Sequence, residues 1–74
     1  MLKKKILIEA KTVVDDVEIA VHSAAISNED YEVSFAVRQI DKEACKQHRD
    51  KVRSDRVEFE DYVYKLQDEL KAGD

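Results

Sequence analysis

The sequence has no proline and no tryptophan, and its single glycine, Gly73, is the penultimate residue. Folds with many strands and tight turns usually place glycine or proline at those turns, so this absence favours long helices. The one cysteine, Cys45, excludes an internal disulfide and is typical of a reducing compartment. No apolar run approaches the roughly 20 residues of a membrane-spanning helix. We therefore predict a cytoplasmic protein with no membrane partner.

Charge is abundant instead. Of the 74 residues, 41% are Asp, Glu, Lys or Arg, and the formal net charge is −4. Hydrophobic residues make up 43% of the chain, which is enough for a folded protein. A chain of this length forms one small domain, residues 1–74, with a thin core of its own. The acidic balance argues against bulk attraction to nucleic acid, so any basic contact has to be local.

The stretch from Asp41 to Lys71 has the strongest helical pattern. Apolar residues recur there every seven positions: Cys45, Val52, Phe59 and Leu66. Such a repeat forms one seam along a helix and suits a partner helix, as in a coiled coil. Asp41 can cap the start of this helix, and Gly73 can end it. We predict a long C-terminal helix.

The first third of the chain also shows apolar residues at three- and four-residue steps: Leu7, Ala10, Val14, Val17, Val21 and Ala24. This spacing favours a helix over residues 2–25. The alternative is a strand Lys4–Ala10 followed by a helix Val13–Ile26, because β-branched residues are dense and Thr12 resembles an N-cap. In that alternative, Asp15 and Asp16 lie in the first turn of the helix.

Residues 27–30, Ser-Asn-Glu-Asp, form the one clear turn, which we predict as the corner of a helical hairpin. The next segment, Tyr31–Ile40, fits the helix that continues into Asp41–Lys71, but its alternation also fits a strand. A strand here would pair with Lys4–Ala10 and give a βαβα order. Because a lone two-stranded sheet is marginal, both strands exist or neither does.

We predict an all-α fold: an antiparallel helical hairpin with a long C-terminal helix, dimerising into a bundle. The alternative is a small α+β protein of βαβα order. In the hairpin, a first helix of about 36 Å cannot cover a second of about 65 Å. A break at residues 53–55 could bury the remainder, but it would need a reversal without glycine. The uncovered row is the predicted partner-binding surface: Phe59, Tyr62, Val63, Leu66 and Leu70.

A basic stripe is the second candidate surface. Five cations follow steps of four, three, four and three on one helical face: Lys42, Lys46, Arg49, Arg53 and Arg56. Such a row can bind phosphates or an acidic protein groove. The competing interpretation is a solvated face, paired locally or with the acids at residues 15–18. The stripe has no interleaved aromatic residues, which argues against nucleic acid.

Histidine and cysteine give weaker signals. Cys45 and His48 share a helical face, but structural zinc needs about four ligands and no second such pair exists. His22 is interpreted as a surface or boundary residue. We predict no catalytic residue, no cofactor and no metal site.

These observations predict a non-enzymatic protein–protein interaction module, such as a small regulator, adaptor or inhibitor. It would act through its C-terminal helix, as a homodimer or with another protein. The alternative is a nucleic-acid-binding regulator whose dimer presents the basic stripe.

Overall fold

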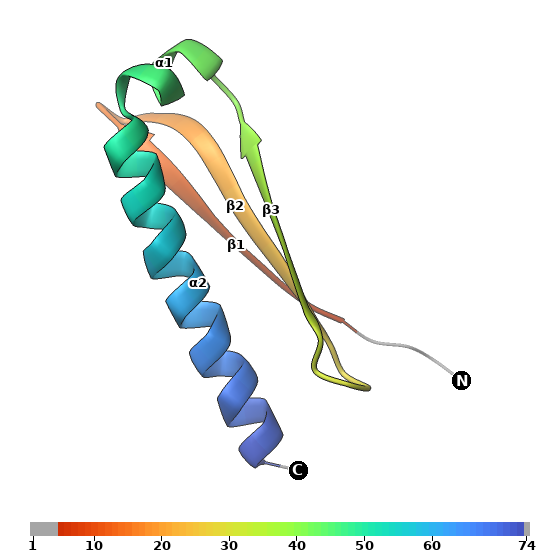
Figure 1. The fold of residues 1–74 in the computed structure, drawn as a ribbon. Coiled ribbons are helices and arrows are strands. Elements are labelled where there is room, and N and C mark those ends of the chain that lie inside the picture. The colour runs from red at the N-terminus through yellow and green to blue at the C-terminus, as the bar shows by residue number, and fades with distance from the viewer. Residues whose placement is uncertain (1–4, 74) are drawn as a thin grey trace.

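The computed structural model describes residues 5–73 and shows an α+β fold: a three-stranded antiparallel sheet and a long C-terminal helix (Figure 1). The strands are β1 (Lys5–Val14), β2 (Val17–Ser27) and β3 (Val33–Gln39), with β2 in the centre. A short helix, α1 (Lys42–Gln47), leads into α2 (Arg49–Ala72). Helix α2 lies along one face of the sheet, chiefly against β1 and β2 (Figure 1).

The all-α prediction is therefore wrong, and so are the helical hairpin and the coiled coil. The βαβα alternative placed strands where β1 and β3 lie, but it put a helix where β2 lies. Strand β2 misleads because it is the central strand, and its buried residues belong to both faces: Ile19, Ala20, Val21, His22, Ala24 and Ile26. A strand buried on both faces reads as a continuous apolar run, much like a buried helix. The parts of these predictions that fall on residues 1–4 lie outside the described residues.

The turn between β1 and β2 consists of Asp15 and Asp16, whose φ angles are 52° and 65°. Positive φ at both central residues is the geometry of a type I′ hairpin turn, and Asp adopts it more readily than most residues. The interpretation of these residues as the first turn of a helix is wrong. Thr12, interpreted in the alternative as a helix cap, is instead fully buried in β1.

A bulge in β2 connects the sheet to the helices. The β1–β2 register shifts between Thr12 and Val13, which leaves Ile19 without a partner on β1. The Ile19 carbonyl oxygen accepts hydrogen bonds from the backbone N–H groups of Ile40 (2.9 Å) and Asp41 (3.2 Å). It also accepts one from the Cys45 thiol, at 3.1 Å. This single carbonyl therefore fixes where α1 begins relative to the sheet.

The caps of the helical region are confirmed. The Asp41 carboxylate accepts a hydrogen bond from the Ala44 N–H at 3.0 Å, and Gly73 is the C-cap of α2. The expectation of one unbroken helix from residue 41 is wrong, because the chain leaves helical geometry at His48 (φ −112°, ψ 37°). No break occurs at residues 53–55, which lie inside α2.

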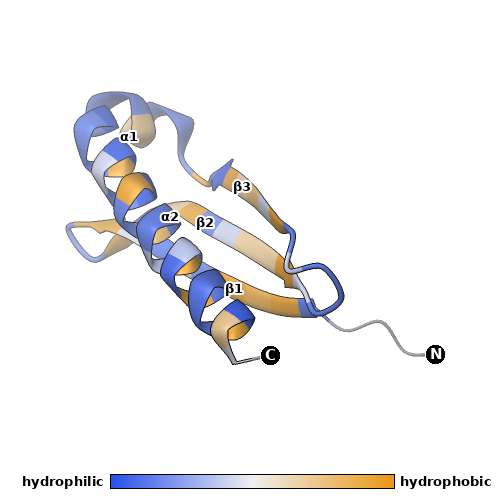
Figure 2. Cartoon of the chain, turned by 60° about the horizontal axis from the view of Figure 1, so that its bottom comes forward, coloured by the Kyte–Doolittle hydropathy of each residue, from blue (hydrophilic) through white to orange (hydrophobic). Residues whose placement is uncertain are grey.

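The sheet covers the apolar row of α2. Phe59 and Val63 are buried together with Ala24 and Ile26 of β2, and Leu66 and Leu70 pack against this cluster. Figure 2 shows apolar residues along the strands and at intervals along α2. Each large side chain buried in this way contributes about 1.5–3 kcal/mol. The seven-residue repeat therefore packs on the chain's own sheet and not on a partner helix.

The predicted turn at residues 27–30 is confirmed as a turn, but it joins β2 to β3. The Ser27 carbonyl accepts from the Tyr31 N–H at 3.0 Å, and the Asp30 carboxylate accepts from the Glu32 N–H at 3.0 Å. Gln67 of α2 donates to the Tyr31 carbonyl at 2.6 Å. This contact ties the far end of α2 to the loop.

Candidate functional site

A groove of about 770 Å³ lies between β3 and the two helices. Its apolar lining comes from Val37, Cys45 and Val52. Every charged side chain that lines it is cationic: Arg38, Lys42, Lys46, Arg49, Arg53 and Arg56. The structure thus brings together all the residues of the predicted basic stripe in one groove.

Three elements supply these cations. Lys42 and Lys46 belong to α1, and Arg49, Arg53 and Arg56 belong to α2. The bulge carbonyl of Ile19 and the Asp41 cap hold α1 at this edge of the sheet, so they position the lysines. Arg38 was missed by sequence reasoning, because only the strand pairing brings β3 beside the helices.

Arg38 differs from the helical cations in its place on the sheet. It pairs with Val21 in the β2–β3 register, on the sheet face turned away from α2. It therefore contributes to the rim of the groove at the β3 edge.

The cations of the groove are largely unneutralised. Arg56 forms an ion pair with Glu60 at 3.4 Å, on an exposed part of α2. Within residues 5–73, Arg56 is the only cation of this groove that forms an ion pair. The acids proposed as neutralising partners lie elsewhere: Asp15 and Asp16 form the β-turn, and Glu18 pairs with Lys11 at 3.2 Å. The groove is therefore a local region of positive charge.

The predicted partner-binding residues do not form one exposed surface. Phe59 and Val63 are buried, and Leu66 and Leu70 pack against the core. Tyr62 is 59% exposed. The helical hairpin would have left this row uncovered, whereas the observed sheet covers most of it.

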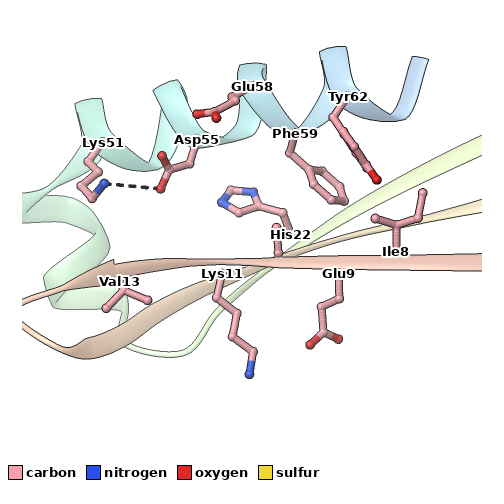
Figure 3. A pocket seen from close by; sticks show the side chains of 11 residues that line it. Ile8, Glu9, Lys11, Val13, His22, Lys51, Asp55, Glu58, Phe59 and Tyr62 are labelled. Atoms are coloured by element: carbon pink, nitrogen blue, oxygen red, sulfur yellow. Dashed lines mark ion pairs between the residues drawn. The ribbon is translucent and has the colours of Figure 1, made fainter. Parts of the chain in front are cut away.

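A second hollow, of about 640 Å³, lies on the other side of α2, beside β1 (Figure 3). Helix α2 contributes Lys51, Asp55, Glu58 and Tyr62 to it, and Lys51 pairs with Asp55 at 3.8 Å. The charges of this hollow are therefore mixed, in contrast to those of the groove.

His22 lies between β1 and α2 in this hollow (Figure 3). It is 1% exposed, so its interpretation as a surface or boundary residue is wrong. Its Nε2 is 2.8 Å from the Thr12 hydroxyl, whereas its buried Nδ1 has no hydrogen-bond partner within the described residues. Burial of the ring lowers the pKa of His22; Asp55 opposes this shift and Arg56 adds to it.

Cys45 and His48 do not act as a pair. Cys45 is buried and donates its thiol hydrogen to the Ile19 carbonyl, whereas His48 is an exposed residue at the α1–α2 junction. Among residues 5–73, no group of three or more His, Cys, Asp or Glu side chains is placed to hold a metal ion.

Comparison with protein-family models, curated proteins and solved structures gives no match. Neither helix in the described part of the chain is long and apolar enough to cross a membrane.

Proposed function

We propose that this chain is a non-enzymatic nucleic-acid-binding protein, and that the groove between β3 and the helices holds phosphates of a duplex. One observation carries the proposal: every charged side chain lining the groove is cationic, in a chain whose net charge is −4. A cluster of cations creates a local positive potential that attracts anions even where the net charge of the chain is negative.

The spacing of the cations fits a row of phosphates. Residues three or four apart on a helix lie about 5–6 Å from each other, so Arg49, Arg53 and Arg56 form a ladder along α2. Each guanidinium offers paired N–H donors that match phosphate oxygens. Lys42 and Lys46 of α1 line the same groove. Together these groups can contact several successive phosphates.

The lining of the groove also indicates that base sequence is not read there. Among the described residues that line the groove there is no aromatic side chain on which successive bases could stack. Contacts to phosphates alone carry no sequence information, and binding of this kind has a Kd of about 10⁻⁴–10⁻⁶ M at physiological salt. We therefore infer duplex binding through the backbone, without base selection.

The acids of α2 orient the complex. Toward the C-terminal end, the helix carries Glu58, Glu60, Asp61, Asp68 and Glu69. Phosphates repel this end and attract the groove end, so the duplex approaches α1 and the first half of α2.

The other function expected from the sequence, association through the α2 row, has less support. Phe59, Val63 and their neighbours already pack on the chain's own sheet. Only Tyr62 of that row remains largely exposed.

Fluorescence anisotropy with a labelled DNA duplex of mixed sequence tests the proposal. We expect affinity to fall steeply between about 50 and about 200 mM salt, because bound cations release counterions. Replacing Arg49 and Arg53 by Gln should weaken binding and reduce the salt slope by about two, roughly one unit per phosphate contact.

The matched control replaces Lys65 and Lys71, two cations of α2 outside the groove, by Gln. This variant changes the net charge equally and should bind with nearly the wild-type slope. Equal losses of affinity in the two variants would contradict the proposal, because the net charge of the chain, and not the position of the cations in the groove, would then determine binding. Polyglutamate that competes as well as the duplex would also overturn it, in favour of an acidic protein partner.

A further inference from the structure

The edge of the sheet formed by β1 is long and open. Strand β1 runs over Lys5–Val14 and pairs only with β2 within the described residues. It contains no proline, and the bulge in the hairpin falls on β2, so β1 stays regular. Natural sheets usually shorten, bend or cover such an edge, because its unpaired N–H and C=O groups can pair with another strand.

Large apolar side chains remain exposed along this edge. Leu7 is 77% exposed and Val13 is 42% exposed, both on the sheet face turned away from α2. Tyr62, 59% exposed, lies beside Ile8 on the other face, where α2 borders β1 (Figure 3). A partner strand here would cover apolar groups on both faces of the sheet.

We propose that β1 pairs antiparallel with β1 of a second copy of this chain, about a two-fold axis at Ala10. A two-fold axis perpendicular to the sheet places residues of the same face opposite each other. Centred on Ala10, Glu9 of each copy lies opposite Lys11 of the other. Leu7 then lies opposite Val13, and Ile8 lies opposite Thr12.

The neighbouring registers are worse in each case. Centring on Glu9 sets Glu9 opposite itself and Leu7 opposite Lys11. Centring on Lys11 sets Lys11 opposite itself and Glu9 opposite Val13. Centring on Ile8 sets Lys5 opposite Lys11. Like charges directly opposite each other are destabilising and opposite charges are stabilising, so the strand itself selects the Ala10 register.

In this register, the charged side chains of β1 meet on the face of the sheet that α2 does not cover. Figure 3 shows Glu9 and Lys11 pointing away from α2, so their contacts with the second copy form on the open face of the sheet. Because α2 lies over β1 and β2, the two α2 helices lie on the same face of the joined sheet. Their facing sides carry Lys51, Asp55 and Glu58, so β1 and not α2 provides the affinity.

The dimer leaves the basic grooves open. The groove lies at the β3 edge, on the opposite side of α2 from β1. Self-association is therefore independent of nucleic-acid binding, and either proposal can fail without the other.

Sedimentation equilibrium of the full chain, without nucleic acid, tests the pairing over micromolar to millimolar concentration. The wild type should dimerise. Glu9→Lys alone and Lys11→Glu alone should each weaken dimerisation by about tenfold or more, because each sets two like-charged pairs across the axis. Lys11→Glu also removes the ion pair with Glu18 within the chain, so Glu9→Lys is the cleaner of the two single variants. Circular dichroism checks that both variants remain folded.

The chain carrying both substitutions gives the decisive result. Only if residue 9 lies opposite residue 11 does this double variant regain opposite charges at both pairs, and it should then dimerise like the wild type although each single variant does not. An equimolar mixture of the two single variants should also form a heterodimer. A monomeric wild type, single variants that dimerise normally, or a mixture that stays monomeric would each overturn the proposal.

Discussion

A hollow lies on each side of α2, between this helix and an edge of the sheet, and the two hollows differ in the charge of their lining. On the β3 side the charged lining is entirely cationic, and on the β1 side Lys51 is accompanied by Asp55 and Glu58. The β3 edge is short and borders the cationic groove, whereas the β1 edge is long and carries exposed apolar residues. One helix therefore separates the surface that we propose to bind phosphates from the edge that we propose to pair with a second copy.

The largest expected effect comes from Phe59, which is buried in the core between α2 and the sheet. The centroid of its ring lies 6.0 Å from that of His22 and 6.4 Å from that of Phe35. Phe59→Ala should lower the free energy of unfolding by about 3–5 kcal/mol, because it leaves a cavity. Denaturant unfolding measures this loss.

Val57→Ala is the matched control, because Val57 is 57% exposed on the same helix. Exposed substitutions of this kind change stability by about 0.5 kcal/mol or less. Equal losses at positions 57 and 59 would contradict the packing of α2 on the sheet.

A smaller loss should come from the β1 side alone. Thr12→Val keeps the shape of the side chain but leaves His22 Nε2 without its partner at 2.8 Å. An unsatisfied buried group of this kind costs about 1–3 kcal/mol. Thr12→Ser, which keeps the hydroxyl, should retain most of the stability in the same unfolding experiment. Affinity for a DNA duplex in the folded Thr12→Val variant should stay at the wild-type value, because the groove is on the other side.

The β3 side has its own sensitive residue, Asp41. Asp41→Ala removes the N-cap of α1 and should cost about 1 kcal/mol, whereas Asp41→Asn keeps an acceptor and should cost less. Because α1 carries Lys42 and Lys46, Asp41→Ala should also weaken duplex binding, as measured by anisotropy. Unchanged affinity for the duplex in this variant would show that the placement of α1 does not contribute to binding.

The smallest change should be the dependence of stability on pH. Burial lowers the pKa of His22 in the folded chain, so the unfolded chain takes up the proton more readily. Stability should therefore be fully present above about pH 6.5, the ordinary histidine pKa, and decrease as the pH falls below it. Thermal unfolding at about pH 7.5 and about pH 5.5 measures the decrease. His22→Gln should reduce this pH dependence.

Local features were predictable from the sequence where one residue has a strong local preference. The Asp41 cap, the end of α2 at Gly73 and the turn after Ser27 are examples. Helical spacing also predicts the grouping of Arg49, Arg53 and Arg56 on α2, whereas their meeting with Lys42 and Lys46 depends on how α1 is placed after the break at His48.

The sheet was not predictable in the same way. Strand β2 is buried on both faces, so its apolar run gave no alternation, and a pair of aspartates replaced glycine in the β1–β2 turn. His22 looked like a surface residue, because its neighbours in space, Thr12 and Phe59, are far away in the chain. The addition of Arg38 to the groove likewise depends on a strand pairing that only the fold reveals.

Residue-resolved NMR of the wild-type chain titrated with a DNA duplex at low salt tests the difference between the two sides most directly. We expect amide signals around the groove, including those of Lys46, Arg49 and Arg53, to shift with duplex concentration, while those of Leu7 and Glu9 on β1 stay in place. Shifts centred on β1 or on the acidic end of α2, or no shifts under conditions where the duplex is in excess, would contradict the account.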